Sequence, residues 1–80
     1  MENNNELINN IKKLHITEMG IERIKNNLEL DTKDVVKWCK SQIIKSDNIY
    51  KKGKNWYVVG ERYIITINSH SYTVITAHKK

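Results

Sequence analysis

Hydrophobic residues follow two different periods along the chain, a helical one first and an alternating one after it. Up to about Ser46 they recur every three or four positions, which predicts helices over residues 4–15, from Thr17 onward, and from Asp31 or Thr32 onward. Beyond Ser46 apolar and polar residues alternate, which predicts strands over residues 48–51 and 56–59 and two more within residues 62–78. This order predicts an α+β fold in which three N-terminal helices pack on one face of a four-stranded antiparallel β-meander.

Capping residues support the predicted helices. Asn3 and Glu6 have the spacing of an N-cap and its reciprocal partner, and Thr17 begins the second helix. Asp31 or Thr32 can cap the third helix. His15 should lie at the end of the first helix, where a histidine complements the helix dipole in a structural role.

The last two strands should form a tight hairpin over the turn Ser69-His70. Val, Ile, Tyr and Thr fill both arms, as suits a half-buried sheet. The expected cross-strand partners are Ile67 with Tyr72, Ile65 with Val74, Thr66 with Thr73, and Tyr63 with Thr76. The final strand would then be an exposed edge, which we expect to be covered by the N-terminal helix or paired with a second copy in a homodimer.

Composition predicts one small domain over residues 1–80, with residues 1–4 frayed. The single cysteine, Cys39, excludes an internal disulfide and favours the cytoplasm. No apolar run reaches the roughly 20 residues of a membrane span, and the N-terminus does not resemble a signal peptide. No membrane contact is therefore expected.

Most of the net charge of +5 lies in the second part of the chain. Residues 1–30 hold four Lys/Arg against five Glu, whereas residues 31–80 hold ten against four Asp/Glu. An acidic partner should therefore meet the third helix or the sheet. A charge of this size can also serve solubility alone.

Several kinds of site are not supported. No cluster of residues suits a metal, no Gly-rich phosphate loop is present, and no cofactor is expected. His70 and His78 stand at opposite ends of one predicted strand, about 25 Å apart, so they cannot act as a pair within one chain.

The residue types that remain suit a phosphodiester. Lysine and arginine neutralise phosphate, aromatic rings stack on unpaired bases, and histidine moves protons near neutral pH. RNA supplies its own nucleophile, the 2′-hydroxyl, so cleavage needs little beyond these groups. Arg62, His70, Thr73 and His78 are the candidate catalytic residues. Lys51, Lys52, Lys54, Trp56 and Lys79 are the candidate nucleic-acid-binding residues.

The short connection over residues 29–31 allows a different site, a helix-turn-helix. Lys33, Lys37 and Lys40 would then lie on a DNA-recognition helix. Apart from Gln42, this predicted helix lacks the Arg, Asn and Gln side chains that read base edges best. A lysine stripe opposite an apolar stripe is usually a solvated helix face.

Two segments, TEMGIERIKNNLELDTKDVVKWCK and KGKNWYVVGERYIITINSHSYTVITAHK, resemble a family of small uncharacterised bacterial proteins, a domain of unknown function. More distantly, the helices-then-meander order and ITINSHSYTVITAH are similar to the barnase–EndoU–colicin–RelE group of small RNases and toxins. That group builds its active sites from scattered His, Lys, Arg, Ser and Thr on one sheet face. The matching residue types here are Lys54, Arg62, His70, Thr73 and His78, and the carboxylate that barnase-type members use as a base is lacking.

Two hypotheses follow. In the first, the chain is a nucleic-acid-directed module, with RNA favoured, and acts as an RNase-toxin-like RNA binder through its basic and aromatic sheet region. In the second, it is a noncatalytic protein-binding module that occupies an acidic or nucleic-acid-binding protein surface, such as an inhibitor of a bacterial defence nuclease. Trp38, Trp56, Tyr50 and Tyr57 would be its anchors.

Overall fold

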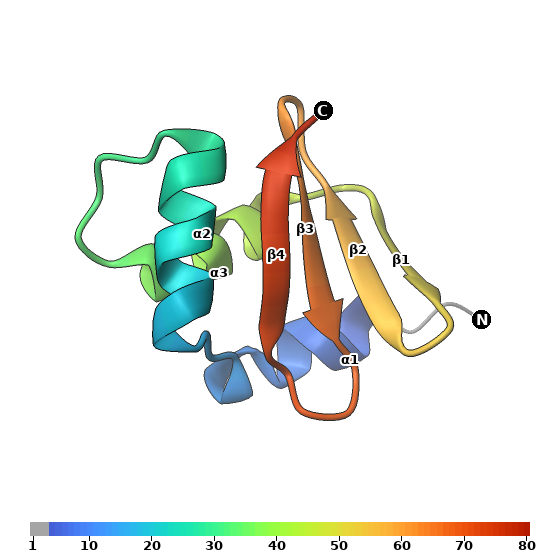
Figure 1. The fold of residues 1–80 in the computed structure, drawn as a ribbon. Coiled ribbons are helices and arrows are strands. Elements are labelled where there is room, and N and C mark those ends of the chain that lie inside the picture. Colours follow the sequence, from blue (N-terminus) through green and yellow to red (C-terminus); the bar gives the residue numbers. More distant parts are fainter. Residues whose placement is uncertain (1–3) are drawn as a thin grey trace.

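In the computed structural model, which describes residues 4–80, three α-helices and a short 3-10 helix precede a four-stranded antiparallel sheet (Figure 1). The helices are α1 (Asn4–Asn9), α2 (Glu18–Leu28) and α3 (Val35–Lys45), and the 3-10 helix is η1 (Ile11–Lys13). The strands are β1 (Ile49–Lys52), β2 (Asn55–Val59), β3 (Tyr63–Asn68) and β4 (Val74–Lys79), in the spatial order β1-β2-β3-β4. The α+β class and the helices-then-meander order are confirmed.

The first helix is shorter than the sequence predicts. It ends at Asn9, and the Asn10 side chain donates to the Glu6 carbonyl oxygen at 2.9 Å. Asparagine competes with helical backbone hydrogen bonds in this way, so the chain tightens into η1 and is extended again at Leu14. The predicted cap, Asn3, and most of the segment expected to fray lie outside the described residues.

The second helix begins as predicted, whereas the third begins later. The Thr17 hydroxyl accepts a hydrogen bond from the Gly20 amide at 3.0 Å. The cap of α3 is Asp34, whose Oδ1 accepts from the Lys37 amide at 2.9 Å, in place of Asp31 or Thr32. The connection from α2 to α3 therefore spans residues 29–34, twice the predicted length, and does not form the tight turn on which the helix-turn-helix alternative depended.

The register predicted for the last hairpin is wrong. The Asn68 side-chain oxygen accepts from the amides of both His70 and Ser71, which opens the turn into a longer loop. Tyr72 closes this loop in the left-handed region, at φ 60°. The observed partners are Ile67 with Val74, Thr66 with Thr76, Ile65 with Ala77, Ile64 with His78, and Tyr63 with Lys79, with a bulge after the first pair. Thr73 therefore belongs to the loop and does not face Thr66.

Helices and strands contribute buried residues to one hydrophobic core. Sheet register aligns Ile49, Val58, Ile65 and Ala77, and all four are buried. The helical members of the same core are Leu7, Ile24, Val35, Cys39 and Ile43. In Figure 1, α2 runs alongside β4, α1 lies behind the lower part of the sheet, and α3 lies behind α2.

The edge of β4 is partly occupied by other segments of the chain. His15 forms a parallel bridge to Thr73, in which its backbone pairs with Tyr72 and Val74. The Asn27 side chain donates to the Ala77 carbonyl oxygen at 3.2 Å. The sequence predicted His15 at the end of a helix. In the structure His15 lies instead in extended chain beside the sheet.

Candidate nucleic-acid interface

A lysine-bearing turn and a histidine-bearing loop meet at one end of the sheet. The Ser69 amide donates to the Lys54 carbonyl oxygen at 2.8 Å and so joins the β3–β4 loop to the β1–β2 turn. The chain around η1 reaches the same end through the His15 bridge. The β1–β2 turn and the β3–β4 loop both lie toward the lower edge of the molecule in Figure 1.

We call this surface the basic loop end. Its members are Lys12, Lys13, His15, Lys51, Lys52, Lys54, His70, Ser71 and Thr73. All five lysines are exposed. The three segments that carry these residues, 10–16, 51–56 and 68–73, contain no Asp or Glu. A surface of this kind attracts polyanions.

Two of the lysines lie against a pair of aromatic rings. Lys13 Nζ is 5.5 Å from the centroid of the Tyr72 ring, and Lys51 Nζ is 6.0 Å from that of Trp56. The two rings are themselves 5.3 Å apart and tilted by 50°. Cation–π attraction therefore helps to hold a cation at each end of this ring pair.

A chain of side-chain hydrogen bonds crosses the same surface. His15 Nε2 lies 2.8 Å from the Thr73 hydroxyl, which lies 2.8 Å from the Ser71 hydroxyl. His15 Nδ1 is 3.0 Å from the Lys13 carbonyl oxygen, which can only accept. In the neutral imidazole, Nδ1 therefore carries the proton and Nε2 accepts the proton of Thr73. Ser71, Thr73 and His15 form what we call the hydroxyl relay.

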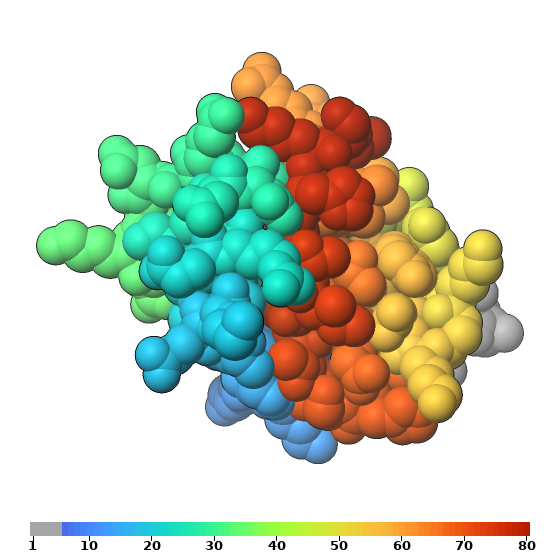
Figure 2. Space-filling model, in the orientation of Figure 1, coloured from blue at the N-terminus to red at the C-terminus, as the bar shows by residue number. Residues whose placement is uncertain are grey.

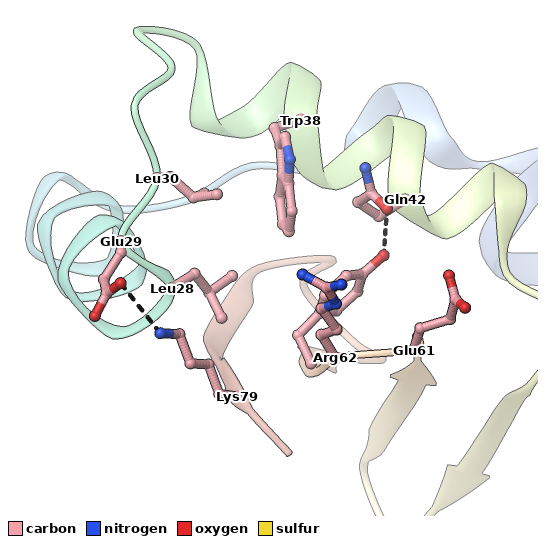
Figure 3. A pocket seen from close by; sticks show the side chains of 9 residues that line it. Leu28, Glu29, Leu30, Trp38, Gln42, Glu61, Arg62 and Lys79 are labelled. Atoms are coloured by element: carbon pink, nitrogen blue, oxygen red, sulfur yellow. Dashed lines mark hydrogen bonds and ion pairs between the residues drawn. The ribbon is translucent and has the colours of Figure 1, made fainter.

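The structure divides the residues that the sequence singled out into two groups. His70, Thr73, Lys51, Lys52 and Lys54 come together at the basic loop end. Arg62, His78 and Lys79 lie at the opposite end of the sheet, where β3 begins and β4 ends. There Lys79 pairs with Glu29 at 3.2 Å, and Arg62 lines a pocket (Figure 3). The four proposed catalytic residues therefore do not share one site.

One proposed nucleic-acid contact needs correction. Trp56 is 1% exposed and is the largest fully buried side chain, so its ring cannot stack on a base. Its indole Nε1 has no hydrogen-bond partner among the described residues. The aromatic residues available on the sheet are Tyr50, 42% exposed, and its cross-strand neighbour Tyr57, with ring centroids 5.3 Å apart.

The sequence did not identify His15, Lys12 and Lys13 as part of the site. They sit in a segment with helical periodicity, more than 50 residues before the loop that they meet. The Lys12-Lys13 pair was the available signal, because two adjacent cations stand directly before Leu14, the last apolar residue of the predicted first helix.

Two groups with perturbed pKa values lie outside the basic loop end. Burial raises the pKa of the Cys39 thiol from 9.0 to about 12. Burial, with smaller contributions from Cys39 and Glu61, raises the pKa of the Tyr63 phenol. Among residues 4–80 no group of His, Cys, Asp and Glu is arranged to hold a metal ion. No helix in this range is long and apolar enough to cross a membrane.

Comparison with known proteins gives one match. A family model described as "Protein of unknown function (DUF3781)" matches residues 8–78. No curated protein and no solved structure matches the chain. The similarity to the barnase–EndoU–colicin–RelE group therefore stays a prediction.

Proposed function

The chain belongs to the DUF3781 family, whose description names no activity, and from its site we propose that it is a nucleic-acid-directed module that binds single-stranded RNA at the basic loop end. The observation that carries this proposal is the hydrogen bond from Ser69 to Lys54. It joins the lysine-bearing β1–β2 turn and the β3–β4 loop into one surface that is free of carboxylates within its three segments. Five exposed lysines on such a surface can neutralise several successive phosphates.

The sheet supplies a stacking surface next to these cations. We infer that the helices pack on a single sheet face, because their buried residues share one core with Ile49, Val58 and Ile65. Tyr50 and Tyr57 point to the other face, where they alternate with these core residues. Figure 2 shows strand residues of β1 to β4 at the surface, with no helix in front of them. Unpaired bases stack on exposed aromatic rings of this kind, which favours single-stranded over double-stranded RNA.

Binding is measured by fluorescence anisotropy of a labelled single-stranded RNA over a series of salt concentrations. The logarithm of the affinity should fall linearly with the logarithm of the salt concentration, with a slope of about −0.7 for each phosphate contacted. A chain that shows no RNA binding at low ionic strength would contradict the proposal. A duplex RNA of the same length tests the preference for single strands.

The hydroxyl relay favours RNA cleavage as a second candidate function. In this reaction the 2′-hydroxyl attacks the adjacent phosphorus, its proton passes to His15 Nε2 directly or through Thr73, and the 5′-oxygen leaves. His70, exposed in the same loop, protonates the leaving oxygen. The products are a 2′,3′-cyclic phosphate and a 5′-hydroxyl. Cleavage in the presence of a chelator that yields these ends supports the mechanism, whereas products with a 3′-hydroxyl exclude it.

The protein-binding alternative stays a prediction and relies on the same sheet region. Tyr50 and Ile75, 42% and 40% exposed, are the large apolar side chains that a partner could cover there. Affinity capture of a stoichiometric protein, together with no RNA binding, would favour this alternative. The homodimer through β4 also stays a prediction, and it would have to form beside the His15 bridge and the Asn27 contact.

A further inference from the structure

A pocket of about 580 Å³ lies at the end of the sheet opposite the basic loop end. It is formed by the end of α2 and the residues after it, by one side of α3, and by the ends of β3 and β4 (Figure 3). Its volume falls within the roughly 300–1,000 Å³ of small-molecule sites. The proposed RNA contacts do not use this pocket.

One part of the pocket is apolar and aromatic. Leu28 and Leu30 line one side, and the Trp38 ring projects into the pocket from α3 (Figure 3). The Trp38 ring lies 5.3 Å from the Tyr63 ring, whose phenol hydroxyl donates a hydrogen bond to Gln42 Oε1. The Trp38 ring is therefore positioned to stack on a planar ligand ring.

The charged part of the pocket includes two cations, Arg62 and Lys79. The Arg62 side chain points into the pocket and has no hydrogen-bond or ion-pair partner among the described residues (Figure 3). A guanidinium binds a phosphate or carboxylate with two parallel hydrogen bonds. The second cation, Lys79, already pairs with Glu29 at 3.2 Å. Both members of that pair are more than half exposed, so the pair is weak and Lys79 can turn to a ligand.

The balance of charge separates this pocket from the basic loop end. Two carboxylates, Glu29 and Glu61, line the pocket together with Arg62 and Lys79. A polyanion would meet these carboxylates, whereas a small molecule with one anionic group can reach Arg62 alone. We propose that this pocket binds a small planar aromatic molecule that carries a single anionic group, such as a nucleoside monophosphate, with the ring on Trp38 and the anion on Arg62.

Quenching of tryptophan fluorescence tests this proposal. Trp38 is half-buried at the pocket, where a bound ligand would contact its ring, whereas Trp56 is buried in the core. The ligands are AMP and UMP, with nicotinate as an aromatic carboxylate that does not fluoresce in the tryptophan range. Adenosine lacks the anion, and inorganic phosphate lacks the ring. We expect saturable quenching by the nucleotides or the carboxylate, with a dissociation constant below about 1 mM. Adenosine and phosphate should bind at least about tenfold more weakly.

The chain offers a matched control for the arginine. Arg62→Gln should weaken binding at least about tenfold, whereas Arg23→Gln, the same change on an exposed position of α2, should leave it unchanged. Lys54→Gln at the basic loop end should also have no effect. Three results would each overturn the proposal. They are equal binding by wild type and Arg62→Gln, equal binding of adenosine and AMP, and no saturable binding of any aromatic anion. Calorimetry of Trp38→Leu gives a second measurement, with an expected loss of about fivefold.

Discussion

His15 and Thr73 are separated by 58 positions in the sequence, yet His15 Nε2 lies 2.8 Å from the Thr73 hydroxyl. The backbone of the same histidine bridges β4 through Tyr72 and Val74. Two backbone hydrogen bonds therefore fix the histidine where its ring meets a loop hydroxyl. This contact places the N-terminal segment, and its two lysines, at the basic loop end.

Thr73→Val tests the hydroxyl relay, because valine keeps the shape and removes the hydroxyl. Since both relay neighbours are exposed and can turn to water, the free energy of unfolding should fall by less than about 1 kcal/mol. RNA cleavage should slow by about 100-fold, with RNA affinity unchanged. Thr76→Val on β4 is the control. Equal cleavage by wild type and Thr73→Val would give the relay a purely structural role.

Lysine substitutions test where RNA binds. The pair Lys52→Gln and Lys54→Gln should reduce the magnitude of the salt slope by about 1.4, because two phosphate contacts are lost. Lys33→Gln with Lys37→Gln removes the same charge from exposed positions near the start of α3. This second pair should bind RNA like the wild type. If it is instead the weaker binder, the α3 lysines of the helix-turn-helix alternative form the interface.

Alanine substitution should lower mainly the stability at Trp56 and mainly the RNA affinity at Tyr50. Trp56→Ala removes the largest fully buried side chain and should cost about 3–5 kcal/mol in the free energy of unfolding. Tyr50→Ala should cost little stability but weaken RNA binding by about 1–3 kcal/mol, the usual value of one base–aromatic stack. Denaturant unfolding and anisotropy measure the two quantities separately. An unchanged RNA affinity in Tyr50→Ala would exclude the open sheet face as a stacking surface.

Burial of Cys39 should make stability depend on pH in the alkaline range. Its folded-state pKa of about 12 lies above the ordinary 9.0, so the unfolded chain loses the thiol proton first as pH rises. The stabilising contribution is complete below about pH 9 and declines between about pH 9 and 12. The stability difference between wild type and Cys39→Ala should therefore shrink over this range.

The same burial should protect the thiol from reagents in the folded chain. With a pKa of about 12, only about 1 in 10,000 folded molecules carries the thiolate at pH 8. A thiol reagent should react slowly until denaturant unfolds the chain. Rapid reaction without denaturant would show that the α3 side of the core opens readily.

Local signals in the sequence determined the elements and part of their ends. Thr17 caps α2 because its hydroxyl needs only an amide three residues away, and Gly53 forms the β1–β2 turn at φ 63°. The change from helical to alternating periodicity predicted the α+β class, because periodicity also depends only on residues that are close in the sequence. Cys39 was recognised as a core residue because it shares a helical arc with Val35 and Ile43.

Only the tertiary structure decided how the functional residues are grouped. Asn68 opens the β3–β4 loop through two side-chain hydrogen bonds, and the bulge then shifts the register, so Thr73 meets His15 instead of Thr66. Tertiary packing also buries Trp56, and it places Arg62 and Lys79 in a pocket at the end of the sheet opposite the basic loop end. Periodicity describes each segment alone, whereas these placements depend on contacts between segments that are distant in sequence. The sequence therefore supplied the residue types of a phosphate-binding surface, and long-range packing selected which of them lie together.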